Sequence, residues 1–322
     1  MDELNIDKKI LDQVVKLEKK YDAMGQDLSS YLDGLLHADY LTYWDYIHLD
    51  TLLSLQNPKT HFPDEKIFII YHQITELYFK LILNEIEQIA FDDAVDSKRF
   101  LMRLNRVNRY LAHLTDSFDV MIDGMDQKQF LDFRMSLLPA SGFQSAQIRM
   151  FEIMSSDMVN LVEVSFRTKV DPGNVAEMYE HIYWRKGATE MATGKKTLTL
   201  KQFEKKYSNA FLATGEKYKA SNIFKKFESN YQDAENAGDI KNALRKLDQL
   251  SNVQWRLAHY KSAVRYLQRD PDIIAATGGT NWQKFLPPRF QRVIFYPALW
   301  SEAEMADWGK NWVEEVVFKN KK

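Results

Sequence analysis

Residues 64–91, DEKIFIIYHQITELYFKLILNEIEQIAF, constrain the fold more than any other stretch of this chain. The stretch has no Gly or Pro, Asp64 can cap its N-terminus, and apolar residues fall on almost every face of the helix that it predicts. A helix that is apolar all round is buried on all sides, so we expect a central helix in a large core. Glu76 and Glu85 make this helix too polar to span a membrane.

His72 lies within this predicted helix, with Phe68 one turn before it and Glu76 one turn after it. A buried imidazole needs a hydrogen-bond partner, or it faces a cavity that holds a ligand. Its position alone favours an ordinary core histidine whose hydrogen bonds are satisfied. His72 therefore becomes a functional candidate only through what the rest of the chain adds.

The overall composition is that of an ordinary globular protein, and it excludes several kinds of chemistry. The 322 residues carry a net charge of −2, which gives no general attraction to nucleic acid or to anionic membranes. The chain has no cysteine, so disulfides, thiolate nucleophiles, cysteine zinc sites and iron–sulfur clusters are excluded. No apolar signal segment is visible at the N-terminus, and we expect a cytoplasmic protein.

Apolar residues recur at helical spacing over most of the chain, and Gly and Pro are scarce. These stripes predict helices over residues 10–21, 100–118 and 240–269, and a capping box at Ser301 and Glu304 predicts the start of a last helix. No internal repeat and no strand-like alternation is visible. We therefore expect an all-α protein, a helical bundle with a single domain.

Two regions look peripheral to this bundle. Residues 1–36 form an amphipathic N-terminal arm that cannot bury its own apolar stripe, so we expect it to pack on its own core or on a neighbouring subunit, while residues 37–322 form the main helical domain. Residues 195–230 are rich in lysine, but Glu204 and Glu216 interleave with the lysines. That pattern is more typical of a solvated helix face than of a binding site.

Two stretches offer polar groups to a ligand. In residues 126–149, Phe130, Arg134 and Leu137 fall on one face of the predicted helix. An arginine in that setting is either a snorkelling surface residue or a carboxylate clamp at the edge of an apolar pocket. The second stretch is the TGGT loop at residues 277–280, which offers hydroxyl and N–H groups.

Two further motifs suit an anion and a metal. The pattern from Ser141 to Gln144 predicts a new helix directly after Ser141, and the N-terminus of such a helix attracts anions. His259 lies one turn after Trp255 in the helix predicted over residues 240–269. A helical histidine beside small residues and an aromatic side chain can ligate haem iron, although an ordinary half-buried histidine is the commoner case.

Together these motifs resemble the tryptophan 2,3-dioxygenase family, whose members are haem-dependent all-helical enzymes. The matching pieces are YWDYIHLDTLLSLQNP, PDEKIFIIYHQITELYFKLILNEI, FRMSLLPASGFQSAQIR, WRLAH and TGGT, and they span most of the chain between Tyr40 and Thr280. The resemblance implies a helical bundle that encloses a pocket for haem b. It also implies that both atoms of O2 are inserted across the indole C2–C3 bond of L-tryptophan to give N-formylkynurenine.

The resemblance assigns the cofactor contacts. His259 would be the axial ligand of the haem iron, and Trp255, Ser141 and Gly142 would also contact the haem. His72 would be the distal histidine, hydrogen-bonded to the indole N–H of the substrate. Each of these roles is implied by the family's motifs at the matching positions.

The resemblance also assigns the substrate contacts. Arg134 would pair with the substrate carboxylate, and Thr277 would contact the amino-acid end of the substrate. The pocket around the indole would be lined by Phe68, Ile69, Ile70, Tyr71, Phe130 and Leu137. Tyr43 and Tyr46 match tyrosines that the family brings in from a neighbouring subunit of a homotetramer. The resemblance implies neither a nucleic-acid partner nor a membrane partner.

The departures from the family pattern fall at the substrate end of the pocket. Phe130 stands where the family usually has a tyrosine, Ala276 replaces a glycine, and residues 281–284 do not follow the usual small-residue pattern. Two alternatives therefore stay open. One is a related histidine-ligated haem monooxygenase that hydroxylates tryptophan or another aromatic amino acid. The other is a non-enzymatic helical interaction protein.

Overall fold

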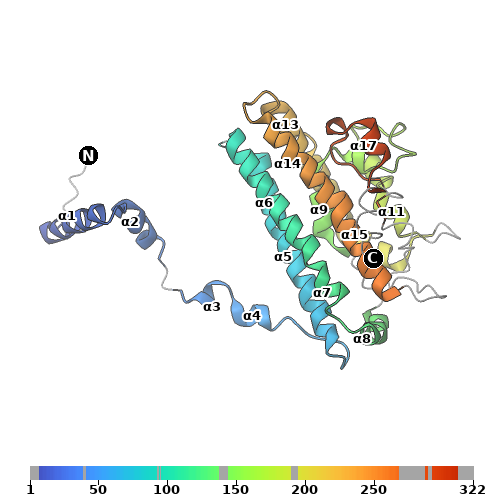
Figure 1. Ribbon diagram of the computed structural model, residues 1–322, viewed down its shortest axis with the longest axis horizontal. Helices are drawn as coiled ribbons and strands as arrows, with labels where there is room; N and C mark the ends of the chain where they lie inside the picture. Colours follow the sequence, from blue (N-terminus) through green and yellow to red (C-terminus); the bar gives the residue numbers. More distant parts are fainter. Residues whose placement is uncertain are drawn as a thin grey trace, which may run out of the picture. The chain divides into compact units, whose positions relative to one another are not determined.

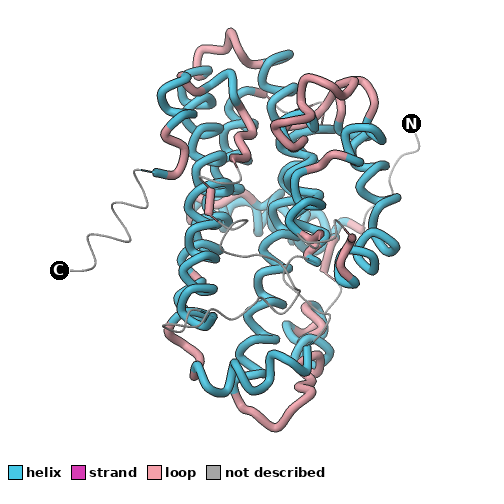
Figure 2. The backbone as a smooth tube through the Cα atoms, turned by 90° about the vertical axis from the view of Figure 1, so that its right-hand side faces the viewer, coloured by secondary structure: helices cyan, strands magenta, loops and turns pink. Residues whose placement is uncertain are grey.

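The computed structural model describes residues 7–38, 41–92, 94, 96–137, 144–189, 195–267, 287–288 and 292–310. Over these ranges the regular structure is helical, with two isolated β-bridges and no strand (Figure 2). The predicted all-α fold class is therefore confirmed. The chain divides into two compact units, residues 1–56 and 57–322, and the predicted arm lies within the first. No helix within the described ranges is both long enough and apolar enough to cross a membrane.

The first unit consists of short helices without a core of their own. The helices are α1 (Lys8–Ala23), α2 (Leu28–Leu36), α3 (Tyr43–Tyr46) and α4 (Leu49–Leu53). The carboxylates of Asp7 and Asp27 accept hydrogen bonds from backbone N–H groups at the starts of α1 and α2. The four helices have no buried residue, and Ile10 and Leu36 are 52% and 82% exposed. The unit therefore does not bury its own apolar stripe.

The larger unit is built from long helices that lie side by side (Figure 1). Helix α5 (Asp64–Phe91) packs on α6 (Ser97–Asp116) and α9 (Ala146–Ser155), α6 packs on α14 (Ala237–Gln249), and α9 packs on α12 (Leu198–Tyr218). The other helices are α7 (Phe118–Ile122), α8 (Gln127–Phe133), α10 (Val175–Glu180), α11 (Tyr183–Gly187), α13 (Ile223–Asn230), α15 (Trp255–Leu267) and α17 (Glu302–Ala306). Short 3-10 turns occupy Arg134–Leu137, Met158–Leu161 and Pro297–Leu299.

Helix α6 shows why the apolar stripe predicts a helix. Its stripe residues are at most 1% exposed, and they are Phe100, Leu104, Val107, Leu111 and Leu114. The 4-3-4-3 spacing places all of them on one side of the helix, against α5 and α14. Each such side chain stabilises the fold by about 1.5–3 kcal/mol on burial. The helix predicted over residues 100–118 is thus confirmed, although it ends at Asp116, and Phe118 begins α7.

Helix α5 is central, but the prediction that it is buried on all sides is wrong. Ile70, Ile74, Leu77 and Leu81 are 39%, 44%, 53% and 46% exposed in the single chain. Their spacing places them on one helix face, whereas Phe79, Ile82 and Ile86 on other faces are at most 1% exposed. The described helices of the larger unit therefore cover only part of the surface of α5 and leave this apolar stripe exposed.

The helix predicted over residues 240–269 is interrupted. Helix α14 ends at Gln249, Leu250–Gln254 forms a π-helical turn, and α15 then carries Trp255 and His259. The hydrogen bonds of a π-turn span one residue more than those of an α-helix, and the apolar periodicity of the sequence does not reveal it. The turn lies directly before the segment that carries His259.

A buried carboxylate ties the C-terminal segment to this interrupted helix. Asp248 is fully buried and accepts hydrogen bonds from the backbone N–H groups of Phe295 and Tyr296 at 3.0–3.2 Å and from Trp300 Nε1 at 3.0 Å. Burial raises the pKa of Asp248 to about 6, against the effect of these donors. Farther along, the predicted capping box of Ser301 and Glu304 is confirmed at the start of α17.

Candidate functional site

Two histidines lie in an apolar cluster that is separate from the main core. The cluster joins α5, α7, α8 and α15. Its buried members are Tyr71, Phe118, Met121, Ile122, Met125, Ala258, Tyr266 and Leu267. His72 and His259 contact this cluster through Tyr71 and Phe118. The cluster is therefore the place where the predicted site residues of α5 and α15 meet.

His72 is held in one tautomer by the backbone of its own helix. Its Nδ1 lies 2.7 Å from the carbonyl oxygen of Phe68, one turn earlier, and the two rings pack at an interplanar angle of 37° with centroids 4.1 Å apart. Because a carbonyl oxygen only accepts, Nδ1 carries the proton, and Nε2 of the neutral ring is an acceptor. Burial lowers the pKa of His72, while the Phe68 carbonyl and Glu76 oppose that shift. His72 therefore offers one lone pair to a donor.

His259 has no hydrogen-bond partner among the residues that the structure describes. Its ring stacks on Phe118 with centroids 5.7 Å apart and lies 5.9 Å from the ring of Trp255. Burial, and after it the charges of His72, Arg149 and Arg256, lower its pKa to about 4. The imidazole is thus neutral near pH 7, which is the form that binds metals.

Helix α8 is fixed to the N-terminus of α5 by a pair of reciprocal hydrogen bonds. The backbone N–H of Asp126 donates to Asp64 Oδ2 at 2.6 Å, and the backbone N–H of Asp64 donates to Gln129 Oε1 at 3.2 Å. Asp126 also caps α8. This arrangement sets the position of Phe130, whose ring lies 4.6 Å from that of Tyr266 and 6.3 Å from that of Phe68.

Arg134 is buried, at 5% exposure, and burial lowers its pKa. The snorkelling alternative is therefore wrong. The single helix predicted through Phe130, Arg134 and Leu137 is also wrong, because α8 ends at Phe133 and Arg134–Leu137 forms a 3-10 turn.

Three aromatic residues of this site were missed in the sequence. Phe133 is fully buried, and its ring lies 5.9 Å from that of Phe68 and 5.6 Å from that of Phe130. Phe118 and Tyr266 connect the cluster to His259 and Phe130. Phe118 was visible as the end of the α6 stripe, but nothing in the sequence places it against His259.

The other predicted residues are distributed as follows. Tyr71 is buried, Ile69 and Leu137 are half-buried, and Ile70 belongs to the exposed stripe of α5. Tyr43 and Tyr46 lie on α3 in the first unit, where they are 71% and 74% exposed.

Several predictions fall at or beyond the edges of the described ranges. Thr277, Ser141 and Gly142 lie outside the described residues, as does the loop at residues 277–280. The N-cap of α9 is Ser145 and α9 begins at Ala146, whereas the helix start predicted at Ser141 lies outside the described residues.

The residues present fit a haem group. The neutral imidazole of His259 is available as a ligand, and the flanking side chains are aromatic and apolar. Next to it, the buried Nε1–H of Trp255 has no acceptor within the described part of the chain, so a donor is available for an acidic group of a cofactor. The residues that the structure describes contain no group of three metal-ligating side chains, but haem iron needs only one or two protein ligands.

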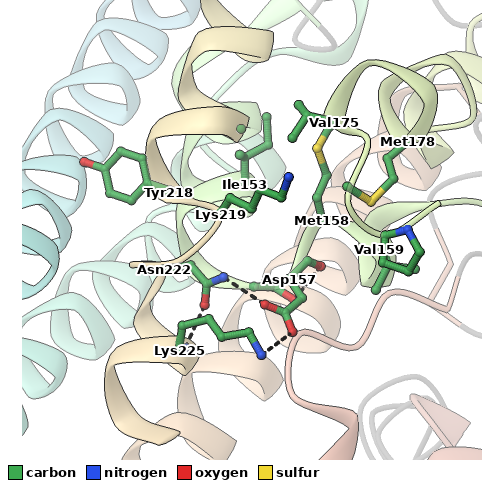
Figure 3. Close-up of a pocket in the computed structure, with 13 residues that line it drawn as sticks. Ile153, Asp157, Met158, Val159, Val175, Met178, Tyr218, Lys219, Asn222 and Lys225 are labelled. Atoms are coloured by element: carbon green, nitrogen blue, oxygen red, sulfur yellow. Dashed lines mark hydrogen bonds and ion pairs between the residues drawn. The ribbon is translucent and has the colours of Figure 1, made fainter. Parts of the chain in front are cut away.

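A separate cavity of about 210 Å³ lies elsewhere in the bundle (Figure 3). It has an apolar floor that includes Met158 and Val175, and a polar rim where Asp157 pairs with Lys225 at 3.2 Å and with Asn222 at 2.9 Å. None of the predicted site residues lines it. We therefore assign it no part in the chemistry at the histidines.

Fold and site together define an all-helical protein with two neutral histidines around one aromatic-lined cluster, suited to a flat iron cofactor. The family model for tryptophan 2,3-dioxygenase matches residues 35–235. This chain belongs to the tryptophan 2,3-dioxygenase family. The match covers the first unit from residue 35, helix α5 with His72, and Arg134, whereas His259 lies beyond it.

Individual relatives carry the same name. The tryptophan 2,3-dioxygenase 2 of Ralstonia nicotianae is 40% identical over 125 residues, which are 35% of this chain and 34% of the relative. The tryptophan 2,3-dioxygenase of Anaeromyxobacter sp. (strain K) is 40% identical over 123 residues, 38% of this chain and 46% of the relative. That of Bacillus thuringiensis subsp. konkukian is 27% identical over 282 residues, 83% of this chain and 94% of the relative. This chain thus spans less than half the length of the first two relatives.

Proposed function

We propose that this protein is a haem-dependent dioxygenase that combines L-tryptophan with O2 to give N-formylkynurenine. One observation carries the proposal: His72 and His259 contact one aromatic cluster as neutral imidazoles, and no described residue bonds to His259. The first histidine suits an indole N–H, and the second suits an iron atom. Membership of the tryptophan 2,3-dioxygenase family supports the same reaction.

Each residue of the pocket would have a separate role in binding the cofactor or the substrate. His259 would ligate haem iron, and Trp255 would lie beside the cofactor. Haem supplies the iron on which O2 is activated. Nε2 of His72 would accept the indole N–H of the substrate, because Nδ1 is committed to the Phe68 carbonyl. The guanidinium of Arg134 would hold the α-carboxylate in a two-bond clamp.

The apolar walls would orient the ring and exclude water. Phe68, Phe130 and Phe133 pack on one another with centroids 5.6–6.3 Å apart, so they form a rigid aromatic wall next to Arg134. Holding the reacting ring in one orientation lowers the barrier without any proton transfer by the protein. Thr277, Ser141 and Gly142 complete the proposed pocket as contacts to substrate and cofactor.

Phe130 favours one alternative outcome. A tyrosine at this position would add a hydroxyl, whereas the phenylalanine packs on Tyr266, whose own hydroxyl lies 3.3–3.4 Å from two backbone carbonyls. The substrate end of the pocket is therefore less polar than in the family pattern. A haem monooxygenase acting on an aromatic amino acid is the second candidate function, and the oxygen count of the product separates the two.

The proposal includes a homotetramer in the cytoplasm. The apolar stripe of α5 is exposed, and the first unit has no core of its own. In the proposed tetramer a second copy of the chain would cover this apolar surface. In that assembly Tyr43 and Tyr46 would complete the pocket of a neighbouring subunit.

Haem titration tests the proposed function. The wild-type protein should bind haem with a Soret band typical of histidine ligation, and His259→Ala should lose the haem or change that spectrum. His113→Ala is the matched control, because His113 is exposed on α6 and stacks on Tyr78, away from the cluster around His259. His72→Ala should keep the haem. If His259→Ala binds haem with the wild-type spectrum, the ligand assignment is wrong.

A further inference from the structure

The C-terminal segment at residues 292–310 packs on one face of the π-turn and α15. Val253 of the π-turn and Leu257 of α15 share a buried apolar cluster with three side chains of this segment, which are Ile294, Trp300 and Trp308. His259 follows Leu257 by two residues, so it lies on the opposite side of the helix. Helix α15 is thus held between the C-terminal segment on one side and the aromatic rings around His259 on the other.

Asp248 connects the same segment to the π-turn. Its fully buried carboxylate accepts hydrogen bonds from the backbone N–H groups of Phe295 and Tyr296 and from Trp300 Nε1, at 3.0–3.2 Å. It also accepts a hydrogen bond at 2.8 Å from Nδ2 of Asn252, which belongs to the π-turn. Both oxygens of a carboxylate accept, whereas an amide would turn an NH2 group toward some of these donors. The site therefore requires an acidic residue.

The π-turn determines how α15 is rotated about its own axis. Successive residues of an α-helix differ by about 100°, so one extra residue would rotate everything after it by that angle. A π-turn takes up one extra residue within a single turn. Leu247 of α14 and Tyr266 of α15 therefore each face their own apolar cluster, on either side of Leu250–Gln254. A change at this turn would rotate His259 together with the rest of α15.

We propose that Asp248, Asn252 and Trp300 form a clamp that holds the π-turn, and that this clamp fixes the direction of the His259 imidazole toward the haem iron. The inference rests on the proposed ligation of haem iron by His259. The ring of His259 has no hydrogen-bond partner among the described residues, so its orientation depends on the backbone of α15 and on stacking against Phe118. The clamp residues act through this backbone, so they are positioning residues.

Haem retention and the iron–histidine bond test the clamp in the haem-loaded protein. Asp248→Asn places an NH2 group against N–H donors, so the π-turn should loosen. We expect haem to pass into excess apomyoglobin about tenfold faster, as when groups that orient a metal ligand are removed. The iron–histidine stretching band in the resonance Raman spectrum of the ferrous protein should shift or broaden. Trp300→Phe removes one donor and keeps an aromatic ring, so its effect should be smaller and in the same direction.

Asn108→Ala is the matched control for a loss of stability alone. Asn108 is 2% exposed, and its Nδ2 donates to the carbonyl oxygen of Ala243 in α14 at 2.9 Å, before the π-turn. This variant should melt at a lower temperature and keep the wild-type Raman band and haem-transfer rate. A wild-type band and rate in Asp248→Asn, or equal changes in Asn108→Ala, would overturn the proposal. If Asp248→Asn does not fold, Trp300→Phe and Asn252→Ala give the same test.

Hydrogen exchange in the haem-free protein separates this inference from the proposed function. The backbone amides of residues 255–259 should exchange about tenfold faster in Asp248→Asn than in Asn108→Ala, because a loosened π-turn lets the start of α15 open locally. Equal exchange in the two variants would overturn the clamp, whether or not the protein binds haem. An unchanged haem spectrum in His259→Ala would instead contradict the ligation on which the inference rests.

Discussion

Single residues determine which atoms of the pocket give and accept hydrogen bonds. The Phe68 carbonyl fixes the proton of His72 on Nδ1 and leaves Nε2 for a donor, while the aromatic rings around His259 supply no hydrogen bond. Arg134 brings a buried cation to the edge of the aromatic wall. An indole N–H requires a neutral acceptor, an iron atom requires a neutral ligand, and a carboxylate requires a cation.

The role of Arg134 is tested by removing its charge. Arg134→Leu should weaken the binding of L-tryptophan by about 2–4 kcal/mol, because the substrate carboxylate then enters a buried site without a partner. The effect should appear as a higher KM in steady-state kinetics. Tryptamine, which has no carboxylate, is the control ligand and should bind the variant and the wild type alike. An unchanged KM for tryptophan would contradict the assignment.

The low pKa of His259 predicts a pH dependence of the haem-free protein. The ordinary pKa of a histidine is 6.5, and that of His259 in the fold is about 4, because burial disfavours the imidazolium. As the pH falls below 6.5, His259 takes up a proton in the unfolded chain but not in the folded one. The folded state therefore loses stability until the pH reaches about 4. Between about pH 7 and about pH 5 the melting temperature should fall more for the wild type than for His259→Phe. Equal falls would show that this histidine is not desolvated.

At the scale of elements, the sequence predicted helices well where an apolar stripe is buried within the larger unit. The stripe of α6 is buried as its spacing requires, and the capping box of Ser301 fixes the start of α17. A local sequence pattern carries no information on which distant residues pack against it in the fold. The π-turn before Trp255 and the 3-10 turn at Arg134 leave no mark in the apolar periodicity, and neither was predicted.

Helix α5 marks the limit of the apolar pattern most clearly. Ile74 and Leu77 look like core residues in the sequence, yet they are 44% and 53% exposed in one chain. An apolar residue that meets its partner only in an assembly has the same sequence pattern as one buried within its own fold. The boundary between the buried and the exposed faces of α5 therefore had to come from the structure.

The exposed stripe of α5 predicts the effect of a charge. If a second copy covers the stripe, Leu77→Glu should shift the protein from a tetramer to smaller species, since an unpaired carboxylate in an apolar interface is costly. Lys80→Glu is the control, because Lys80 is exposed on another face of the same helix. Deletion of residues 1–36 should likewise reduce both oligomerisation and activity. Light scattering after gel filtration measures the mass, and a tetrameric Leu77→Glu variant would show that the stripe is not an interface.

At the scale of the whole molecule, the bundle brings one helix from each half of the chain to a common site. Helix α5 supplies His72, and α15 supplies His259 about 190 residues later, while α8 adds Phe130 beside them. The motifs at these positions resembled one family in the sequence, and the family match supports that reading. The chain departs from the family pattern at the substrate end of the pocket. The central claim is therefore that the reaction still inserts both oxygen atoms of O2 into L-tryptophan.

Isotope labelling of the product tests that claim most directly. The ferrous, haem-loaded protein is incubated with L-tryptophan and ¹⁸O₂, without added peroxide or reductant, and the product is analysed by mass spectrometry. A dioxygenase places both labelled oxygen atoms in ring-opened N-formylkynurenine, which is the result we expect. One labelled oxygen in a hydroxylated product with an intact ring would contradict it and assign the protein to the monooxygenases.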